Sequence, residues 1–163
     1  MAVRKGDTMP GLEEITKDNI HLYCRFEKDF ENEMKYFQSR IYPENSDFFA
    51  PLIKDGLLRW SYIVSDGRPI GAIWLEKEHT CLPTAKLGIF IAEKDMRCKG
   101  IGRKAIEQFI QRNKKEMKLN QVTLNVRKEN IRAIRCYEKC GFVSEQQYEK
   151  PGGIKVLKMI KSL

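Results

Sequence analysis

Residues 90–103 read Phe-Ile-Ala-Glu-Lys-Asp-Met-Arg-Cys-Lys-Gly-Ile-Gly-Arg, and this stretch decides the fold. An apolar run that favours a strand ends at Ala92, two glycines follow at 100 and 102, and a helical pattern then begins. Glycine has no Cβ, so consecutive backbone N–H groups can approach an anion closely, and a helix N-terminus adds partial positive charge. The stretch predicts a phosphate-binding turn between a strand and a helix, with an ordinary βα turn as the alternative.

Two other phosphate-binding motifs do not fit this turn. A P-loop requires GxxxxGK[ST], and Gly100-Ile101-Gly102 lacks both the four-residue gap and the hydroxyl residue. A dinucleotide-binding turn has a third small residue, which Ala105 could supply, but it also needs an acidic residue about 20 positions later. Residues 125–127 read Asn-Val-Arg and contain no carboxylate, so this motif is excluded as well.

The rest of the chain predicts a mixed α/β domain. Apolar, β-favouring runs predict strands at residues 58–64 and 70–78, and alternation of apolar residues predicts one at 122–126. Further strands are expected at 12–15, 86–92, 143–148 and 154–159. Spacings of three and four residues predict helices at 17–38, from 101 onward and at 131–140. Residues 40–56, which hold Pro43 and Pro51, are expected to form a loop with at most one helical turn. Asp66-Gly67 predicts a hairpin turn, and Gly141 predicts a helix end.

The segment from Val122 to Phe142 reads Val-Thr-Leu-Asn-Val-Arg-Lys-Glu-Asn-Ile-Arg-Ala-Ile-Arg-Cys-Tyr-Glu-Lys-Cys-Gly-Phe. Together with Arg97-x-x-Gly100-x-Gly102, it resembles the GNAT superfamily of N-acetyltransferases, which transfer an acetyl group from acetyl-CoA to a primary amine. The first signature matches the family's Arg/Gln-x-x-Gly-x-Gly/Ala turn, and the second matches its strand–Asn–helix–Tyr–Glu–Lys–x–Gly–Phe run. The resemblance covers about residues 57–148.

This resemblance implies a fold and a domain organisation. The implied fold class is α/β (α+β), with a GNAT-like mixed, largely antiparallel central sheet of six to seven strands and helices on both faces. Residues 1–163 would form a single acetyltransferase domain. Within it, residues 1–56 would be the variable acceptor side and residues 84–142 the acetyl-CoA-binding core.

The resemblance also implies how acetyl-CoA is held. The strand before the turn would pair with the pantetheine arm, and the amides of the turn would hold the pyrophosphate. Asn130 would hydrogen-bond the pantetheine, although asparagine also suits a helix N-cap, and Ala133 would leave room for the arm. A net charge of +9 over residues 94–139, counted independently, agrees with a ligand that carries several phosphates. The implied cofactor-binding residues are Phe90, Ile91, Ala92, Arg97, Cys98, Lys99, Gly100, Ile101, Gly102, Arg103, Asn130, Ala133 and Tyr137.

Tyr137 is the implied general acid. A phenol of pKa about 10 stays protonated at neutral pH and can give its proton to the departing CoA thiolate, whereas the alternative is a tyrosine that only packs against the sheet. The attacking amine must also lose a proton, and residues 86–92 contain no carboxylate. Glu76 and Glu78, on one face of the preceding predicted strand, are the candidate bases, although each also suits a solvated strand edge.

Composition limits the class of protein. A chain of 163 residues with 42% hydrophobic residues suits one compact domain. Five cysteines without paired spacing favour a reducing cytoplasm over a disulfide framework, and two histidines without a CxxC pair argue against a metal site. No apolar stretch approaches the length of a membrane helix. We therefore expect a cytoplasmic monomer or homodimer with no metal, membrane or nucleic-acid partner.

The sequence thus predicts an N-acetyltransferase that moves an acetyl group from acetyl-CoA directly to a small-molecule amine or a peptide N-terminus. Residues 88–95 look closest to family members that act on ribosomal-protein N-termini, polyamines or aminoglycosides. A non-catalytic acyl-CoA-binding or regulatory domain of the same fold is the alternative. A basic nucleic-acid-binding module would instead require affinity that falls steeply with salt and no competition from CoA.

Overall fold

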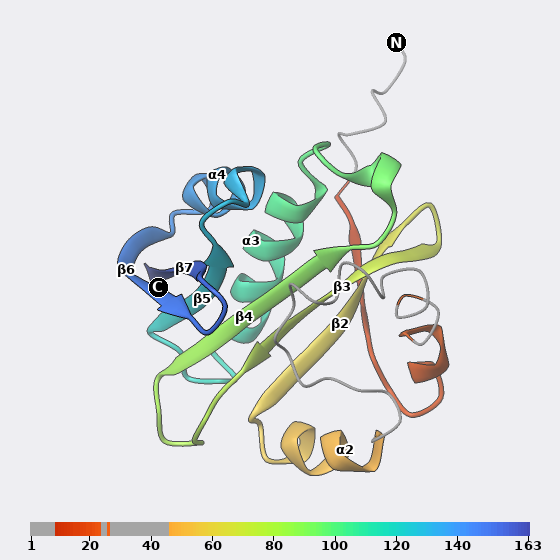
Figure 1. Cartoon of the computed structure of the whole chain (residues 1–163). Helices are drawn as coiled ribbons and strands as arrows, with labels where there is room; N and C mark the ends of the chain where they lie inside the picture. The colour runs from red at the N-terminus through yellow and green to blue at the C-terminus, as the bar shows by residue number, and fades with distance from the viewer. Residues whose placement is uncertain (1–8, 24–25, 27–45) are drawn as a thin grey trace.

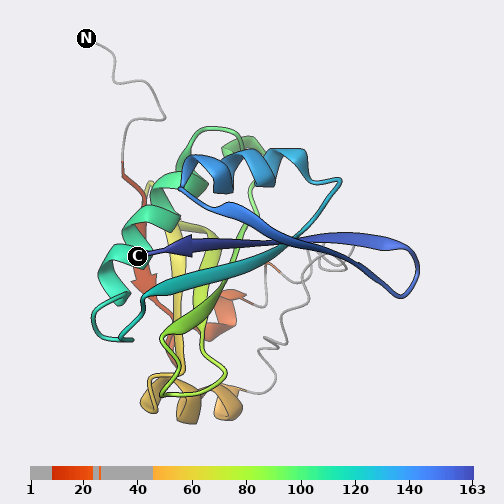
Figure 2. The same cartoon turned by 90° about the vertical axis from the view of Figure 1, so that its left-hand side faces the viewer.

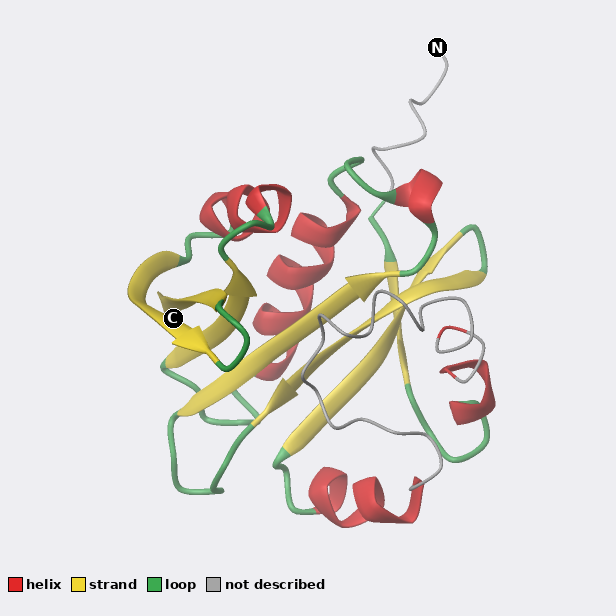
Figure 3. Cartoon of the chain, in the orientation of Figure 1, coloured by secondary structure: helices red, strands yellow, loops and turns green. Residues whose placement is uncertain are grey.

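In the described part of the chain, seven strands form one sheet in the order β1-β2-β3-β4-β5-β7-β6 (Figure 1). The computed structural model describes residues 9–23, 26 and 46–163. The strands are β1 Gly11–Glu14, β2 Leu58–Ser65, β3 Arg68–Glu76, β4 Thr84–Ile91, β5 Gln121–Arg127, β6 Val143–Lys150 and β7 Ile154–Ser162. The helices are α2 Ser46–Lys54, α3 Ile101–Asn113 and α4 Ile131–Lys139, with 3₁₀ turns η1 Ile20–Leu22 and η4 Lys94–Met96 (Figure 3).

The sheet is mixed and largely antiparallel, as predicted. Every pair of neighbouring strands is antiparallel except β4 and β5, which run parallel and are joined through α3. Figure 2 shows this crossover helix with α4 beside it. Because β4 and β5 are parallel, their C-terminal ends, which precede α3 and α4, lie at the same end of the sheet.

Buried residues form two cores, one on each face of the sheet, because side chains alternate along the strands. The first, here called the helix-side core, packs α3 residues such as Ile106 and Phe109 against β4 and β5. The second, here called the aromatic core, consists of Ile15, Tyr23, Phe26, Leu58, Trp60, Tyr62, Ala72, Trp74 and Phe90. Leu52 and Ile53 of α2 pack against the aromatic core, so helices cover both faces as predicted.

Both predicted turn signals are confirmed. Asp66 and Gly67 join β2 to β3 with positive φ angles of 50° and 71°, the pattern of a type I′ hairpin turn. Gly141 follows α4 with a φ of 87°, and the Phe142 N–H bonds back to the Tyr137 carbonyl oxygen at 3.0 Å. This is the left-handed helix end that glycine favours.

Three expectations about element bounds need correction or fall outside the described residues. The loop expected at 40–56 is wrong in its described part, because α2 runs through Pro51, whose carbonyl still accepts the Asp55 N–H at 2.8 Å. An interior proline removes its own N–H donor and crowds the preceding turn, but the hydrogen bonds after it can still form, and here the helix continues to Lys54. The strand expected at 70–78 ends at Glu76. Most of the helix expected at 17–38 lies outside the described residues, which include only its η1 turn, Tyr23 and Phe26.

Candidate functional site

Strands β4 and β5 separate toward their C-terminal ends, which lead into α3 and α4. Their ladder holds only three pairs and ends at Lys86↔Thr123, whereas β4 continues to Ile91 and β5 to Arg127. On their outer sides, β4 stays paired with β3 and β5 with β7 along this whole length. The facing edges of the two strands are therefore no longer paired with each other, and an extended ligand could bond to them.

The turn between β4 and α3 presents a row of backbone donors. Cys98 and Gly100 adopt positive φ angles of 61° and 77°, and Gly100 is the N-cap of α3 without a side-chain cap. Within the described residues, no acceptor takes the backbone N–H groups from Cys98 through Arg103. Cys98, Lys99 and Gly100 are also exposed. Six consecutive donors at an uncapped helix N-terminus form a site that a pyrophosphate fits.

The Arg97 side chain stabilises the turn by bonding to the backbone, in addition to placing a positive charge near it. Its Nε donates to the Ile91 carbonyl oxygen at 2.9 Å, and an Nη donates to the Ala92 carbonyl oxygen at 3.2 Å. The guanidinium therefore holds the end of β4 against the turn while its positive charge stays beside the six donors. Of the other predicted basic residues, Arg103 pairs with Glu107 at 2.9 Å, one helical turn along α3.

Helix α4 packs against the first turn of α3 and brings the second sequence signature to the same place. The Asn130 Oδ1 accepts the Ala133 N–H at 3.2 Å, so Asn130 is the N-cap of α4. No acceptor among the described residues takes its amide Nδ2, which can therefore donate to a ligand. Cys136 Sγ lies 3.9 Å from the position that a Cβ on Gly102 would take, which places α4 directly beside the turn.

Tyr137 lies on the inner side of α4, packed against the helix-side core. Its ring makes an edge-to-face contact with Phe142 at a centroid distance of 6.0 Å. Burial raises the pKa of the Tyr137 hydroxyl above its ordinary value, and the neighbouring Cys136 and Cys140 thiols raise it further. Because no acceptor among the described residues holds this hydroxyl, the protonated phenol can donate to a bound group.

The two cysteines of α4 form a coupled pair beside Tyr137. A hydrogen bond with Cys140 lowers the pKa of the Cys136 thiol, and the nearby Lys139 and Arg103 charges act in the same direction against burial. The same hydrogen bond and burial raise the pKa of Cys140. Cys140 Sγ also contacts the Arg103 carbonyl oxygen at 3.9 Å. The pair thus holds α4 to α3 next to the turn.

Glu76 and Glu78 lie at the other end of β4 from the turn. Glu76 is the last residue of β3, exposed and level with Lys86, and Glu78 is an exposed residue of the loop beyond it. At about 3.3 Å per residue, the five residues from Lys86 to Ile91 place Glu76 about 17 Å from the turn end of β4. The structure therefore gathers the predicted cofactor-binding residues but does not bring these two carboxylates to them.

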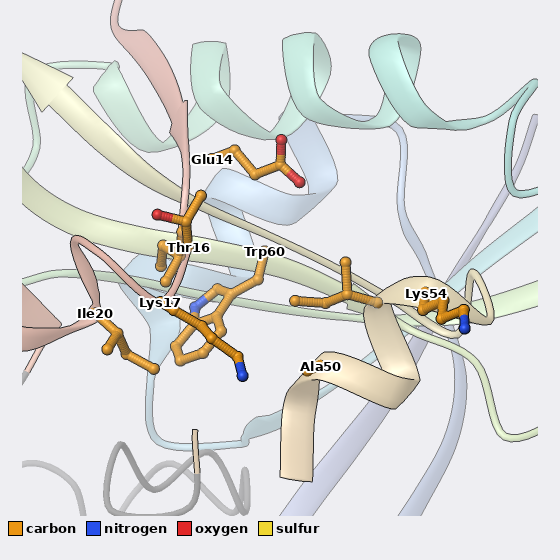
Figure 4. A pocket seen from close by; sticks show the side chains of 9 residues that line it. Glu14, Thr16, Lys17, Ile20, Ala50, Lys54 and Trp60 are labelled. Atoms are coloured by element: carbon orange, nitrogen blue, oxygen red, sulfur yellow. The ribbon is translucent and has the colours of Figure 1, made fainter. Parts of the chain in front are cut away.

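A separate pocket of about 300 Å³ lies on the aromatic side, between β1, η1 and α2 (Figure 4). The Trp60 indole forms its inner wall, and Glu14, Lys17 and Lys54 stand around it. The pocket is two strands away from β4, because Trp60 pairs with Trp74 on β3 and Trp74 pairs with Gly88 on β4.

Sequence reasoning missed Trp74 and Gly88, which are cross-strand partners on β3 and β4, with the Trp74 ring in the aromatic core. The available signal was a lone glycine inside a strand pattern, which often marks a close approach by another group. A Cβ built on Gly88 would lie only 2.0 Å from the Trp74 Cζ2 atom. The glycine is therefore required by the indole above it.

Comparisons with known proteins agree with this arrangement. Residues 19–142 match the model of the acetyltransferase (GNAT) family. Spermidine N-acetyltransferase from Vibrio cholerae, solved with CoA and spermine, has a TM-score of 0.78 at 21% identity, covering 94% of this chain and 95% of that one. A ribosomal L7/L12 α-N-protein acetyltransferase, solved with coenzyme A as a CoA–cysteine disulfide, has a TM-score of 0.82 at 10% identity, with 96% of each chain covered.

An aminoglycoside acetyltransferase in complex with coenzyme A has a TM-score of 0.73 at 17% identity, with 94% of each chain covered. All three identities are low, so these structures show a shared fold and nothing finer. No curated protein matches the sequence. No helix in the described part of the chain is long and apolar enough to cross a membrane.

Proposed function

The chain belongs to the acetyltransferase (GNAT) family, and from this premise we propose that it transfers an acetyl group from acetyl-CoA directly to a primary amine, with Tyr137 as general acid. Family membership makes it an acyltransferase of the GNAT type. The donor site, the role of Tyr137 and the class of acceptor are the parts proposed here. Solved structures of the same fold contain CoA, which supports this choice of donor.

The observation that carries the proposal is the row of six backbone N–H groups from Cys98 to Arg103, in the turn that follows the C-terminal end of β4. Pyrophosphate is a suitable ligand for such a row because each donor faces an anion without a competing acceptor. Phe90 and Ile91 at the end of β4, with Ala92 just after it, lead away from the turn along the opening between β4 and β5. A pantetheine arm contains amide groups that can bond to such an edge, and the Asn130 amide can donate to it from the other side.

Tyr137 would act when the carbon–sulfur bond of the thioester breaks. Bound acetyl-CoA supplies the acetyl group as a thioester, and the amine nitrogen forms the new bond to its carbonyl carbon. The Tyr137 hydroxyl gives its proton to the departing sulfur, so that CoA leaves as a neutral thiol. The raised pKa keeps this phenol protonated at neutral pH, so the proton is present when the thiolate departs.

The proton lost by the amine has no assigned carboxylate in this chain. Glu76 and Glu78 are exposed and stay candidate bases, and we propose that water carries the proton from the amine to solvent. Holding the amine and the thioester together can contribute about 7–11 kcal/mol, which reduces the demand on a single base.

The decisive experiment replaces Tyr137 with phenylalanine. We expect Tyr137→Phe to reduce kcat for acetyl transfer by about 100-fold, in the lower range of general acid effects, while calorimetry shows unchanged CoA affinity. Tyr148→Phe on the edge strand β6, which is separated from β4 by β5 and β7 in the sheet and carries no predicted site residue, is the matched control and should retain full activity. A non-catalytic acyl-CoA-binding domain is the alternative, and it would bind CoA but show no acetyl transfer before any substitution.

A further inference from the structure

The Trp74 indole takes the place of a side chain on Gly88. A Cβ built on Gly88 would lie 2.0 Å from Cζ2, 2.1 Å from Cε2 and 2.6 Å from Nε1 of Trp74, and these are its three nearest heavy atoms. The two residues are cross-strand partners of β3 and β4. The indole therefore crosses from β3 onto β4, and the edge that carries its nitrogen lies above the Gly88 backbone.

Gly88 belongs to the part of β4 that has separated from β5. The last pair between these strands is Lys86↔Thr123, two residues before Gly88. The opposite face of β4 is closed by the helix-side core, where Leu87 is only 5% exposed. A molecule that approaches the opening across the sheet must therefore come from the aromatic side, where the Trp74 edge lies.

The indole nitrogen of Trp74 is a donor without an acceptor. Trp74 is 4% exposed as a residue, and no acceptor among the described residues takes its N–H. Its Nε1 is not one of the buried side-chain atoms without a partner in the described part of the chain, so the N–H is open to water or to a bound molecule. A bound molecule that displaces this water keeps the hydrogen bond only if it brings an oxygen to the same position.

We propose that the Trp74 N–H donates a hydrogen bond to the acceptor and selects amines that carry a carbonyl or hydroxyl oxygen close to the reacting nitrogen. This inference rests on the proposed acetyltransferase function and specifies its acceptor. An indole N–H is a donor only, and the ammonium groups of a linear polyamine are donors only as well. A polyamine thus leaves the N–H unpaired, and sites built to hydrogen-bond a substrate discriminate strongly against analogues that lack the partner atom.

Two amines of the same carbon branching test the inference. Alaninamide carries a carbonyl next to its amine-bearing carbon, and sec-butylamine has a methylene and a methyl group there instead. Trp74→Phe removes the N–H and keeps an aromatic ring in the core. We expect it to lower kcat/KM by about fivefold for alaninamide, the loss of one neutral hydrogen bond, and by less than twofold for sec-butylamine. Comparing each amine with itself cancels the difference in amine basicity.

Trp60→Phe is the matched control, because Trp60 lies on the same face one strand farther from β4. It should change kcat/KM equally little for both amines. It also leaves Trp74 as the sole tryptophan, since the chain has two. In this variant, saturated with CoA, alaninamide should shift the tryptophan emission and sec-butylamine should not, which tests the contact even if Trp74→Phe fails to fold.

An equal loss for both amines, no loss for either, or an emission shift with sec-butylamine alone would overturn the role of Trp74 while leaving the acetyltransferase function intact. Absence of acetyl transfer and of CoA binding in the unsubstituted protein would instead refute the proposed function itself.

Discussion

Arg97 donates from Nε to the Ile91 carbonyl oxygen at 2.9 Å, so the side chain at the start of the anion-binding turn holds the last residue of β4. The same guanidinium bonds to the Ala92 carbonyl oxygen at 3.2 Å. Strand edge and turn are thereby fixed relative to each other, and one extended ligand can contact both. The arginine thus contributes geometry as well as charge.

Replacing Arg97 should therefore cost more than the loss of one positive charge. We expect Arg97→Ala to weaken CoA binding by about tenfold or more, because hydrogen bonds from a charged group are each worth about 1.5–3 kcal/mol. Lys94→Ala, which removes an exposed positive charge from the neighbouring η4 turn, is the control and should weaken binding by less than threefold at 0.15 M salt. Isothermal calorimetry with CoA measures both, and equal effects of the two variants would show that only charge matters.

Gly88→Ala should destabilise the protein by about 1–3 kcal/mol, because the new methyl group overlaps the Trp74 indole in a packed core. Urea unfolding measures the change. Gly102→Ala is the control for stability, since a Cβ there meets only Cys136 Sγ at 3.9 Å. Adding Trp74→Phe to Gly88→Ala should recover part of the loss, and additive effects of the two substitutions would argue against the overlap.

Asn130 has two separable roles, and two substitutions distinguish them. Asn130→Ala should lower the free energy of unfolding by about 1 kcal/mol, since it removes the cap on the Ala133 N–H. Asn130→Ser keeps a capping oxygen but removes the amide donor, so it should retain stability and still weaken CoA binding. Thermal unfolding and calorimetry on the same samples provide both readings. Undiminished CoA affinity in Asn130→Ser would limit this residue to capping.

The raised pKa of Tyr137 predicts a definite dependence on pH. In the folded protein the phenol holds its proton more tightly than in the unfolded chain, whose tyrosine has a pKa of about 10. Its contribution to stability is therefore complete below pH 10 and is lost as the pH rises above 10. Relative to Tyr137→Phe, the unsubstituted protein should lose free energy of unfolding only above that pH. A constant difference between the two proteins up to pH 11 would contradict the raised pKa.

The pH dependence of acetyl transfer should also reflect the raised pKa of Tyr137. As the pH rises from 7 to 9, more of the acceptor amine becomes neutral, so kcat/KM should increase. No decrease from ionisation of Tyr137 should appear below pH 10, since burial keeps its proton in place. A steady-state pH profile with a fixed amine checks this, and a fall in rate between pH 8 and 9 would assign the acid role to a group with a lower pKa.

Much of the fold could be predicted from the sequence, because its signals are local. Apolar runs marked β2 and β3, alternating apolar residues marked β5, Asp66-Gly67 marked a hairpin, and Gly141 marked the end of α4. The wrong prediction of a loop at α2 also came from a local signal. Pro51 suggested a break, but tertiary packing of Leu52 and Ile53 against the aromatic core supports a helix through it.

The turn residues 98–103 and the residues of α4 are near each other in the sequence pattern of the family, so they could be named in advance. The position of Glu76 could not, because it depends on where β3 ends and on its register with Lys86. A pattern of period two gives the face of a strand but not its distance from a site.

The sequence by itself determined the order of the strands, the helices α3 and α4, the glycine turn before α3 and the asparagine before α4, since backbone preferences act over a few residues. Only the tertiary structure decided that β4 and β5 part after three pairs, that Arg97 bonds to Ile91, and that Trp74 covers Gly88. Those relationships join residues on different elements, and they depend on strand register and side-chain packing, which no local preference encodes.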